Sequence, residues 1–121
     1  MRRDMELIRR MLLAIETQDE ESRCAVFEME KEDDAAVNYH LCLLEEAGLI
    51  EAEGTGTMES EGWIVARLTW NGHDFLDSVR DERIWNGVLG QIKSVSSSVA
   101  FDILKSCAKH LASRALGIAV E

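Results

Sequence analysis

The chain contains three histidines and three cysteines, the side chains that most often bind transition metals. The histidines are His40, His73 and His110, and the cysteines are Cys24, Cys42 and Cys107. Zinc sites need such ligands at short, defined spacings, for example two histidines four residues apart on one helix. Here the histidines are far apart along the chain and no two cysteines form a Cys-x-x-Cys pair. The sequence therefore predicts no metal site, and we expect the cysteines to be small buried residues.

Motifs for catalysis are missing as well. The sequence has no Gly-x-x-x-x-Gly-Lys-Ser/Thr loop for phosphate and no Gly-x-Ser-x-Gly turn for a nucleophile. Acid pairs occur at residues 33–34 and 45–46. Neighbouring side chains on a helix diverge by about 100°, and such pairs are typical of solvated surface. We expect no enzymatic activity and no cofactor.

The net charge of −10 is concentrated in the first half of the chain. Residues 1–60 contain 6 Lys/Arg and 16 Asp/Glu, whereas residues 61–121 contain 7 of each. A surface of this sign repels nucleic-acid phosphates and favours basic partners, although solubility alone would explain it equally well. No apolar run is long enough to span a membrane, and an odd number of separated cysteines suits a reducing compartment. A cytoplasmic protein without a membrane segment is expected.

The first half of the chain predicts two helices separated by a short strand. Met5, Ile8, Leu12 and Ile15 form one apolar stripe, which indicates a helix over residues 2–17. Residues 24–29 are a candidate strand, and residues 33–47 form a second helix. His40 falls within the apolar arc of that helix, where a histidine is more often a hydrogen-bonded core residue than a ligand.

A hairpin and a third helix follow. Gly48 is expected to end the second helix in a left-handed conformation, with a strand starting at residues 49–52. Gly and Thr at residues 54–57 predict a turn, and residues 63–68 a return strand rich in β-forming residues. Thr69 is placed to cap a third helix, which continues toward Trp85 and is loosened by Gly87 and Gly90. Its inward side chains are predicted to be Phe75, Leu76 and Val79.

Residues 99–116 predict a last helix with an unusually wide apolar arc. About half of its circumference is apolar, and so wide an arc usually contacts more than one neighbour. Pairing with a second copy of the chain would cover the excess, and folding back over the first helix is the alternative. The candidate dimer residues are Phe101, Ile103, Leu104, Cys107, Leu111 and Ala115.

These elements predict an α+β, mainly helical fold of the winged-helix type. Residues 1–95 would form the winged-helix-like domain, with a degenerate helix-turn-helix and a wing of two or three strands. Residues 96–121 would add the C-terminal helix. Winged helices commonly read DNA through the helix before the wing. That helix has no Lys or Arg, its outward face is acidic, and the wing adds further acids. The candidate acidic interaction face is Asp34, Asn38, Glu45 and Glu46 on the helix with Glu51 and Glu53 on the wing.

Three stretches resemble one protein family. They are MRRDMELIRR at residues 1–10, YH with LLEEAGLI at residues 39–40 and 43–50, and LTWNGHDFLD at residues 68–77. Together they resemble a domain family of unknown function that is frequent in bacteria, prophages and phages and is viewed as winged-helix-like. The resemblance covers nearly the whole chain. It implies the fold and a phage-associated context, and it brings no catalytic residues.

Two functional hypotheses follow. In the first, the chain is a non-enzymatic module that contacts a protein partner, possibly a basic host or phage protein, and forms a homodimer. DNA binding would then be weak or absent. In the alternative, it is a DNA-binding regulator of the winged helix-turn-helix class that uses bases outside the usual face, namely Arg2, Arg3, Arg9 and Arg10.

Overall fold

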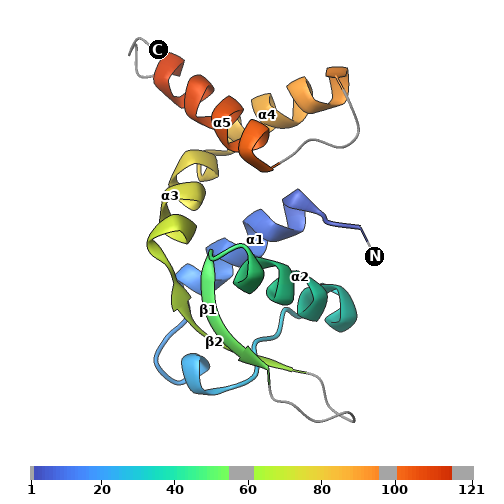
Figure 1. The fold of residues 1–121 in the computed structure, drawn as a ribbon, viewed down its shortest axis with the longest axis vertical. Helices are drawn as coiled ribbons and strands as arrows, with labels where there is room; N and C mark the ends of the chain where they lie inside the picture. The colour runs from blue at the N-terminus through green and yellow to red at the C-terminus, as the bar shows by residue number, and fades with distance from the viewer. Residues whose placement is uncertain (1, 55–61, 96–100, 116–121) are drawn as a thin grey trace. The chain divides into compact units, whose positions relative to one another are not determined.

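A computed structural model describes residues 2–54, 62–95 and 101–115 of the chain. The fold is α+β and mainly helical, as the sequence predicts (Figure 1). The chain divides into two compact units, residues 1–73 and residues 74–121. This division falls inside a helix and not at residues 95–96, where the sequence suggests a domain boundary.

The first unit begins with α1 (Met5–Glu16), which starts later than the sequence suggests. The Asp4 carboxylate accepts hydrogen bonds from the backbone N–H groups of Glu6 and Leu7, at 3.0 and 3.2 Å. Such a cap fixes the first turn, so Arg2 and Arg3 precede the helix and do not belong to it. The expected apolar stripe is present: Ile8, Leu12 and Ile15 are buried and Met5 is half-buried.

The candidate strand at residues 24–29 is not a strand. A short 3-10 helix, η1 (Ser22–Cys24), occupies its start, and a single antiparallel bridge joins Val26 to Ile64. The backbone N–H of Phe27 donates to the carbonyl of Trp63 at 2.7 Å, and the Phe27 side chain is buried. The run is too short, and Ala and Met are too weak as β formers, to extend the pairing further.

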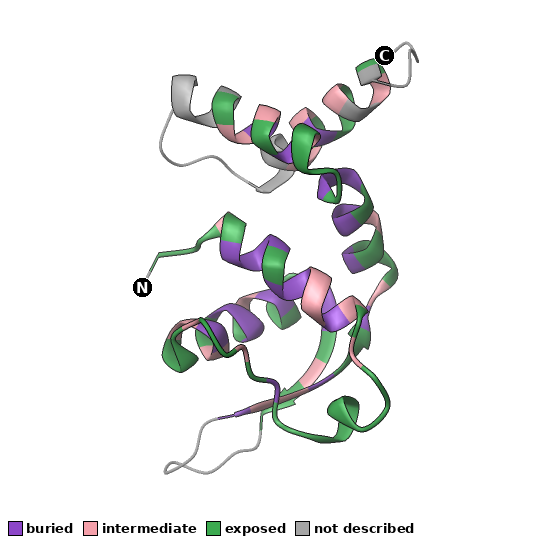
Figure 2. Cartoon of the chain, turned by 180° about the vertical axis from the view of Figure 1, so that it is seen from behind, coloured by how far each residue is buried: buried purple, intermediate pink, exposed green. Residues whose placement is uncertain are grey.

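The second helix, α2 (Asp34–Glu46), packs against α1. Asp33 caps it by accepting from the Ala36 N–H at 3.3 Å. Buried side chains line one face of each helix (Figure 2). On α2 these are Val37, His40, Leu41 and Leu44. Gly48 follows with a φ of 75°, the left-handed conformation expected for a helix-ending glycine.

Two strands complete the first unit. β1 (Ile50–Gly54) pairs antiparallel with β2 (Trp63–Leu68), and a bulge lies between Glu51 and Ala52. The pairing sets Glu51 opposite Arg67. Of the expected hairpin turn at residues 54–57, only residue 54 is among the described residues. The described part of the sheet has two strands, the smaller of the two expected sizes.

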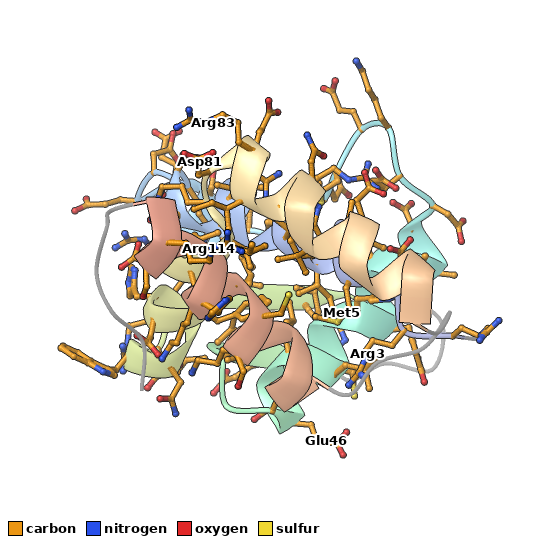
Figure 3. The ribbon with its side chains drawn as sticks, turned by 90° about the horizontal axis from the view of Figure 1, so that it is seen from above. Arg3, Met5, Glu46, Asp81, Arg83 and Arg114 are labelled. Atoms are coloured by element: carbon orange, nitrogen blue, oxygen red, sulfur yellow. The ribbon has the colours of Figure 1, made fainter. Side chains whose placement is uncertain are left out.

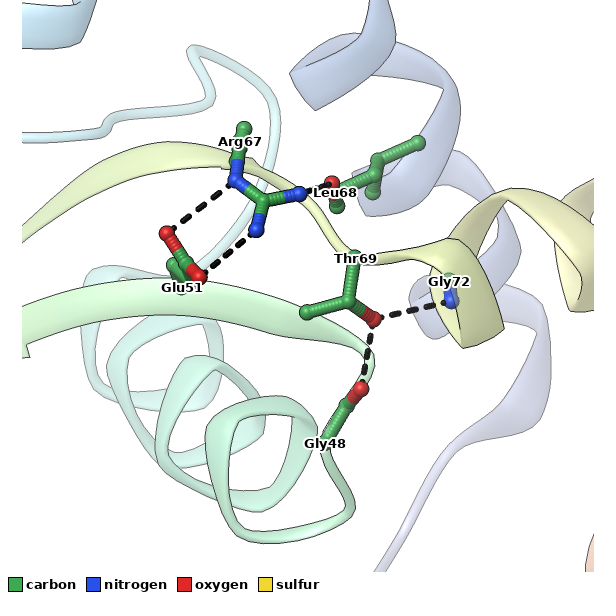
Figure 4. A network of polar contacts seen from close by, with 6 residues as sticks. All are labelled: Gly48, Glu51, Arg67, Leu68, Thr69 and Gly72. Carbon is green, nitrogen blue, oxygen red and sulfur yellow. Dashed lines mark hydrogen bonds and ion pairs between the residues drawn. The ribbon is translucent and has the colours of Figure 1, made fainter.

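Thr69 joins the end of α2 to the start of α3 (Trp70–Val79). Its hydroxyl donates to the carbonyl of Gly48 at 2.5 Å and accepts from the N–H of Gly72 at 3.1 Å (Figure 4). The expected cap is therefore confirmed. Gly72 has no side chain for a simple reason: a Cβ there would lie 2.0 Å from the backbone oxygen of Leu49.

The third helix does not continue toward Trp85. It ends at Val79, and a separate helix, α4 (Glu82–Val95), begins after Asp81. The Asp81 carboxylate accepts from the N–H of Arg83 at 2.8 Å, and the Asp81 carbonyl accepts from the N–H of Trp85 at 2.9 Å. An aspartate in this position favours the start of a new helix. Two helices therefore form where the apolar spacing predicts one.

In the second unit α4 packs against α5 (Phe101–Ala115). Leu111 approaches Gly87 so closely that a Cβ on Gly87 would lie 3.1 Å from the Leu111 Cδ1 atom. Gly87 therefore permits a close helix contact. Phe75, Leu76 and Val79 of α3 are buried, as expected.

Candidate interaction surface

The outward face of α2 is the surface that the sequence singles out for function. At about 100° per residue, its members fall within an arc of about 140°, opposite the buried face. We call this set the α2 outward face: Asp34, Ala35, Asn38, Tyr39, Cys42, Glu45 and Glu46. All are exposed except Asn38, which is half-buried. The helix thus presents a continuous strip to solvent from its first turn to its last.

This strip is acidic, and α2 contributes no Lys or Arg to it. Asp34, Glu45 and Glu46 are exposed, and the last turn of α2 contains no basic residue. The C-terminal end of a helix adds a partial negative charge to its surroundings. Four of the six predicted residues of the acidic face are therefore gathered on one side of α2: Asp34, Asn38, Glu45 and Glu46.

The two predicted residues on the hairpin behave differently from those on α2. Glu51 is held by Arg67 through two hydrogen bonds, Nε to Oε2 at 3.1 Å and Nη2 to Oε1 at 2.7 Å (Figure 4). The opposite charges offset each other, so the pair offers little net charge. Because both side chains are about half exposed, it also contributes little to stability. Glu53 is exposed on β1. Because Arg67 is neutralised by Glu51, the described part of the hairpin offers no excess positive charge.

Tyr39 is a member of this surface that sequence reasoning missed. Its side chain is 40% exposed, and its ring meets the ring of His40 edge-on with centroids 5.7 Å apart. His40 is buried and bonded at both ring nitrogens. Nε2 accepts from the Asp4 N–H at 2.8 Å and Nδ1 lies 2.7 Å from the Ala36 carbonyl. The expected role of His40 as a satisfied core residue is confirmed, and it gives Tyr39 a fixed neighbour.

The four arginines proposed for DNA contact differ in exposure and in pairing. Arg2 and Arg3 are exposed ahead of α1. Arg9 is only 9% exposed, and Arg10 forms an ion pair with Glu32. Arg9 is therefore covered, and Arg10 is engaged by an acid. The four arginines do not form one uniformly exposed basic patch.

The candidate dimer residues all lie on α5. Cys107 and Leu111 are half-buried, and Leu111 is already in contact with α4 at Gly87. The side chains of Phe101, Ile103, Leu104 and Ala115 lie outside the described part of the structure. Within its own unit α5 packs on α4, and Lys105 and Lys109 of α5 bind Asp74 of α3. The sequence reasoning considered neither contact.

The cysteines are more accessible than expected. Cys24 and Cys42 are exposed, so their prediction as buried residues is wrong. Cys24 is the last residue of η1, and Cys42 lies in the middle of the α2 outward face. Neither position faces the core. Cys107 is half-buried, and burial raises the pKa of its thiol. Within the described ranges, no three His, Cys, Asp or Glu side chains are grouped as a metal site would require.

Three aspartates are held in their charged form by local donors. Lys105 and, more weakly, Lys109 lower the pKa of Asp74, with Nζ atoms 2.9 and 3.3 Å from Oδ2. Arg83 lowers the pKa of Asp81 at the start of α4 (Figure 3). The N–H and hydroxyl of Ser22 lower the pKa of Asp19 before η1. Each carboxylate ties a helix or turn together and is a structural group.

Comparison with known proteins places the chain in a family. The family described as "Hypothetical protein (DUF2513)" matches residues 2–98, and the chain belongs to it. A relative from Haemophilus influenzae, described as "Uncharacterized protein", is 36% identical over 117 residues, which is 96% of this chain and 99% of the relative. No solved structure matches the chain. The expected membership of a family of unknown function is confirmed. Among the described residues, no helix has the length and apolar character needed to cross a bilayer.

Proposed function

We propose that the chain is a non-enzymatic, winged-helix-like module that binds a basic protein through the α2 outward face. The order α1, α2, β1, β2 and the tight return from Gly48 to Thr69 support the winged-helix assignment. Between the bridge at Val26 and β1 the chain forms one helix, α2, which supports the shortened helix-turn-helix expected from the sequence. The resemblance noted above supports a phage or prophage setting.

The acidity of the α2 outward face carries this proposal. In a winged helix this face would enter the major groove, where phosphates supply most of the non-specific affinity. Asp34, Glu45 and Glu46 occupy it, α2 itself contains no Lys or Arg, and Arg67 is engaged by Glu51. The same charges attract a basic protein surface and speed its association. Tyr39 adds a partly exposed aromatic ring of the kind that anchors interfaces.

The test is affinity capture from bacterial lysate with three forms of the protein. The wild type is compared with Glu45→Lys/Glu46→Lys and with Glu20→Lys/Glu21→Lys. Glu20 and Glu21 are also adjacent and exposed, so the control changes net charge equally at another place. The proposal predicts a basic protein that the wild type and the control retain and the α2 variant loses. Equal retention by all three forms would contradict it.

DNA binding is the second candidate function, and exposed Arg2 and Arg3 favour it. Contact through these two side chains alone would neutralise about two phosphates, so a plot of log K against log salt concentration would have a slope of about −2. The proposal predicts no sub-micromolar binding of random duplex at about 150 mM salt. Sub-micromolar affinity with this salt dependence, abolished by Arg2→Ala/Arg3→Ala, would establish DNA binding instead.

We also propose that the chain forms a homodimer through α5. The apolar composition of that helix supports pairing, since burying the excess against a second copy removes it from water. Because Leu111 already packs on Gly87, replacing it would disturb α4 and α5 within one chain. Light scattering of the unmodified protein is therefore the cleaner test. A mass near 13.6 kDa at high micromolar concentration would contradict the dimer.

A further inference from the structure

Trp70 is the most exposed large apolar side chain among the described residues. It is 85% exposed, whereas Trp85 is buried and Trp63 is half-buried. Tryptophan buries about 150–250 Å² when covered and is enriched at the centres of protein interfaces. An indole left this open on the first turn of a helix is available to a partner.

The backbone around Trp70 is held firmly. The N–H of Thr69 donates to the carbonyl of Leu49 at 3.0 Å, and its hydroxyl bridges Gly48 and Gly72. Gly72 lies so close to Leu49 that no side chain fits between them. Thr69 and Gly72 are thus both anchored (Figure 4), and Trp70 lies between them in the sequence. A side chain on a fixed backbone loses less conformational entropy when a partner covers it.

The charge of the unit that carries Trp70 selects the chemistry of that partner. Residues 1–73 contain seventeen acidic and seven basic residues, whereas residues 74–121 contain six of each. The nearest preceding base, Arg67, is paired with Glu51. The hydrogen bond from Thr69 to Gly48 joins the C-terminal end of α2 to the N-terminal end of α3. The partial negative charge of the first helix end and the partial positive charge of the second therefore offset each other. The excess acidic side chains therefore set a negative field, which draws cations.

We propose that Trp70 receives an arginine side chain of the basic partner, stacked on the indole face. Tryptophan is the best aromatic partner for a cation, and a guanidinium group stacks on it more readily than an ammonium group. This inference rests on the proposed function and adds the chemistry of one contact to it. A nucleobase can also stack on an exposed aromatic ring, but the net charge of residues 1–73 opposes the phosphates that accompany it.

Two peptides of equal charge, octa-arginine and octa-lysine, separate stacking from simple attraction. Affinities are measured by tryptophan fluorescence for the wild type and for Trp70→Leu, and by calorimetry where the signal is lost. The wild type should prefer octa-arginine, and Trp70→Leu should lose about two- to fivefold in affinity for it, with the preference abolished. Val26→Ala, which trims another exposed apolar side chain, should change neither affinity. Trp70→Phe should fall between wild type and Trp70→Leu, and it covers the case in which Trp70→Leu fails to fold.

If Trp70→Leu still preferred octa-arginine over octa-lysine, the inference would be wrong. It would also be wrong if an oligothymidine quenched the fluorescence of Trp70 and octa-arginine did not. The Glu45→Lys/Glu46→Lys variant separates this result from the proposed function. This variant should have a lower affinity for both peptides, and the ratio of the two affinities should stay unchanged. If it weakens both while Trp70→Leu changes nothing, the acidic face stands and the role of Trp70 fails.

Discussion

His40 of α2 holds the first residue before α1 by accepting the backbone N–H of Asp4 on its Nε2 atom, at 2.8 Å. Because an N–H can only donate, Nε2 must be unprotonated, and the hydrogen resides on Nδ1, facing the Ala36 carbonyl. Asp4 is itself the cap of α1. One buried imidazole therefore links α2 to the residue that caps α1.

Replacing His40 by leucine should destabilise the protein by about 1–3 kcal/mol, because the Asp4 N–H would lose its partner. Urea unfolding followed by circular dichroism measures this cost. Tyr39→Phe is the matched control at the neighbouring position, and as a change at a partly exposed hydroxyl it should cost less than about 0.5 kcal/mol. If the two variants were equally stable, the bond from Asp4 to His40 would contribute nothing.

A pair of glycine substitutions should have opposite effects. Gly72→Ala places a Cβ 2.0 Å from the Leu49 oxygen, so the junction between β1 and α3 must shift and the protein should lose stability. Gly90→Ala meets nothing within 4 Å inside α4 and should gain about 0.5–1 kcal/mol from helix propensity. Thermal melting of both variants tests this. A stable Gly72→Ala variant would show that the junction is not closely packed.

The three thiols should react with iodoacetamide in two groups. Cys24 and Cys42 are exposed, whereas Cys107 is half-buried and burial raises its pKa, which lowers its thiolate fraction near neutral pH. Mass spectrometry should show two additions followed by a third that is several times slower. The slow phase should disappear in Cys107→Ala alone. Three additions at one rate would contradict the description of Cys107.

The stability of the protein should fall in acid partly through Asp74. Its pKa is lowered by the hydrogen bond from Lys105, so in the folded state it stays charged at a pH where the unfolded chain takes up a proton. Its contribution is therefore present above about pH 4 and is lost as the pH falls through the lowered pKa. Melting temperatures of wild type and Asp74→Asn should converge toward low pH. Lys105→Met/Lys109→Met should reproduce the flatter profile, and parallel curves for all three proteins would be the contrary result.

The helix ends that were predicted correctly have a local chemical cause. Gly48 can adopt a positive φ, and Thr69 can cap, so each residue determines its own backbone. His40 was assigned to the core because its position on the helical wheel coincides with the buried face. These features depend on a few neighbouring residues, which a sequence displays directly.

The features that were missed depend on competition between signals or on distant partners. The apolar spacing from Phe75 through Trp85 suggested one helix, although Asp81 carried the capping signal that divides it. The acidity of the α2 outward face could be read from the sequence. The pairing of Glu51 with Arg67 required the strand register, and the support of Tyr39 by His40 required the ring positions.

Backbone amide chemical shifts of the isotopically labelled protein, recorded as the captured basic partner is added, test the central claim most directly. The account predicts the largest changes along the α2 outward face, at Ala35, Asn38, Tyr39, Cys42 and Glu46. It also predicts that Glu45→Lys/Glu46→Lys weakens the titration by at least about tenfold, or about 1.4 kcal/mol. Changes confined to Arg2 and Arg3, with α2 unaffected, would contradict the claim.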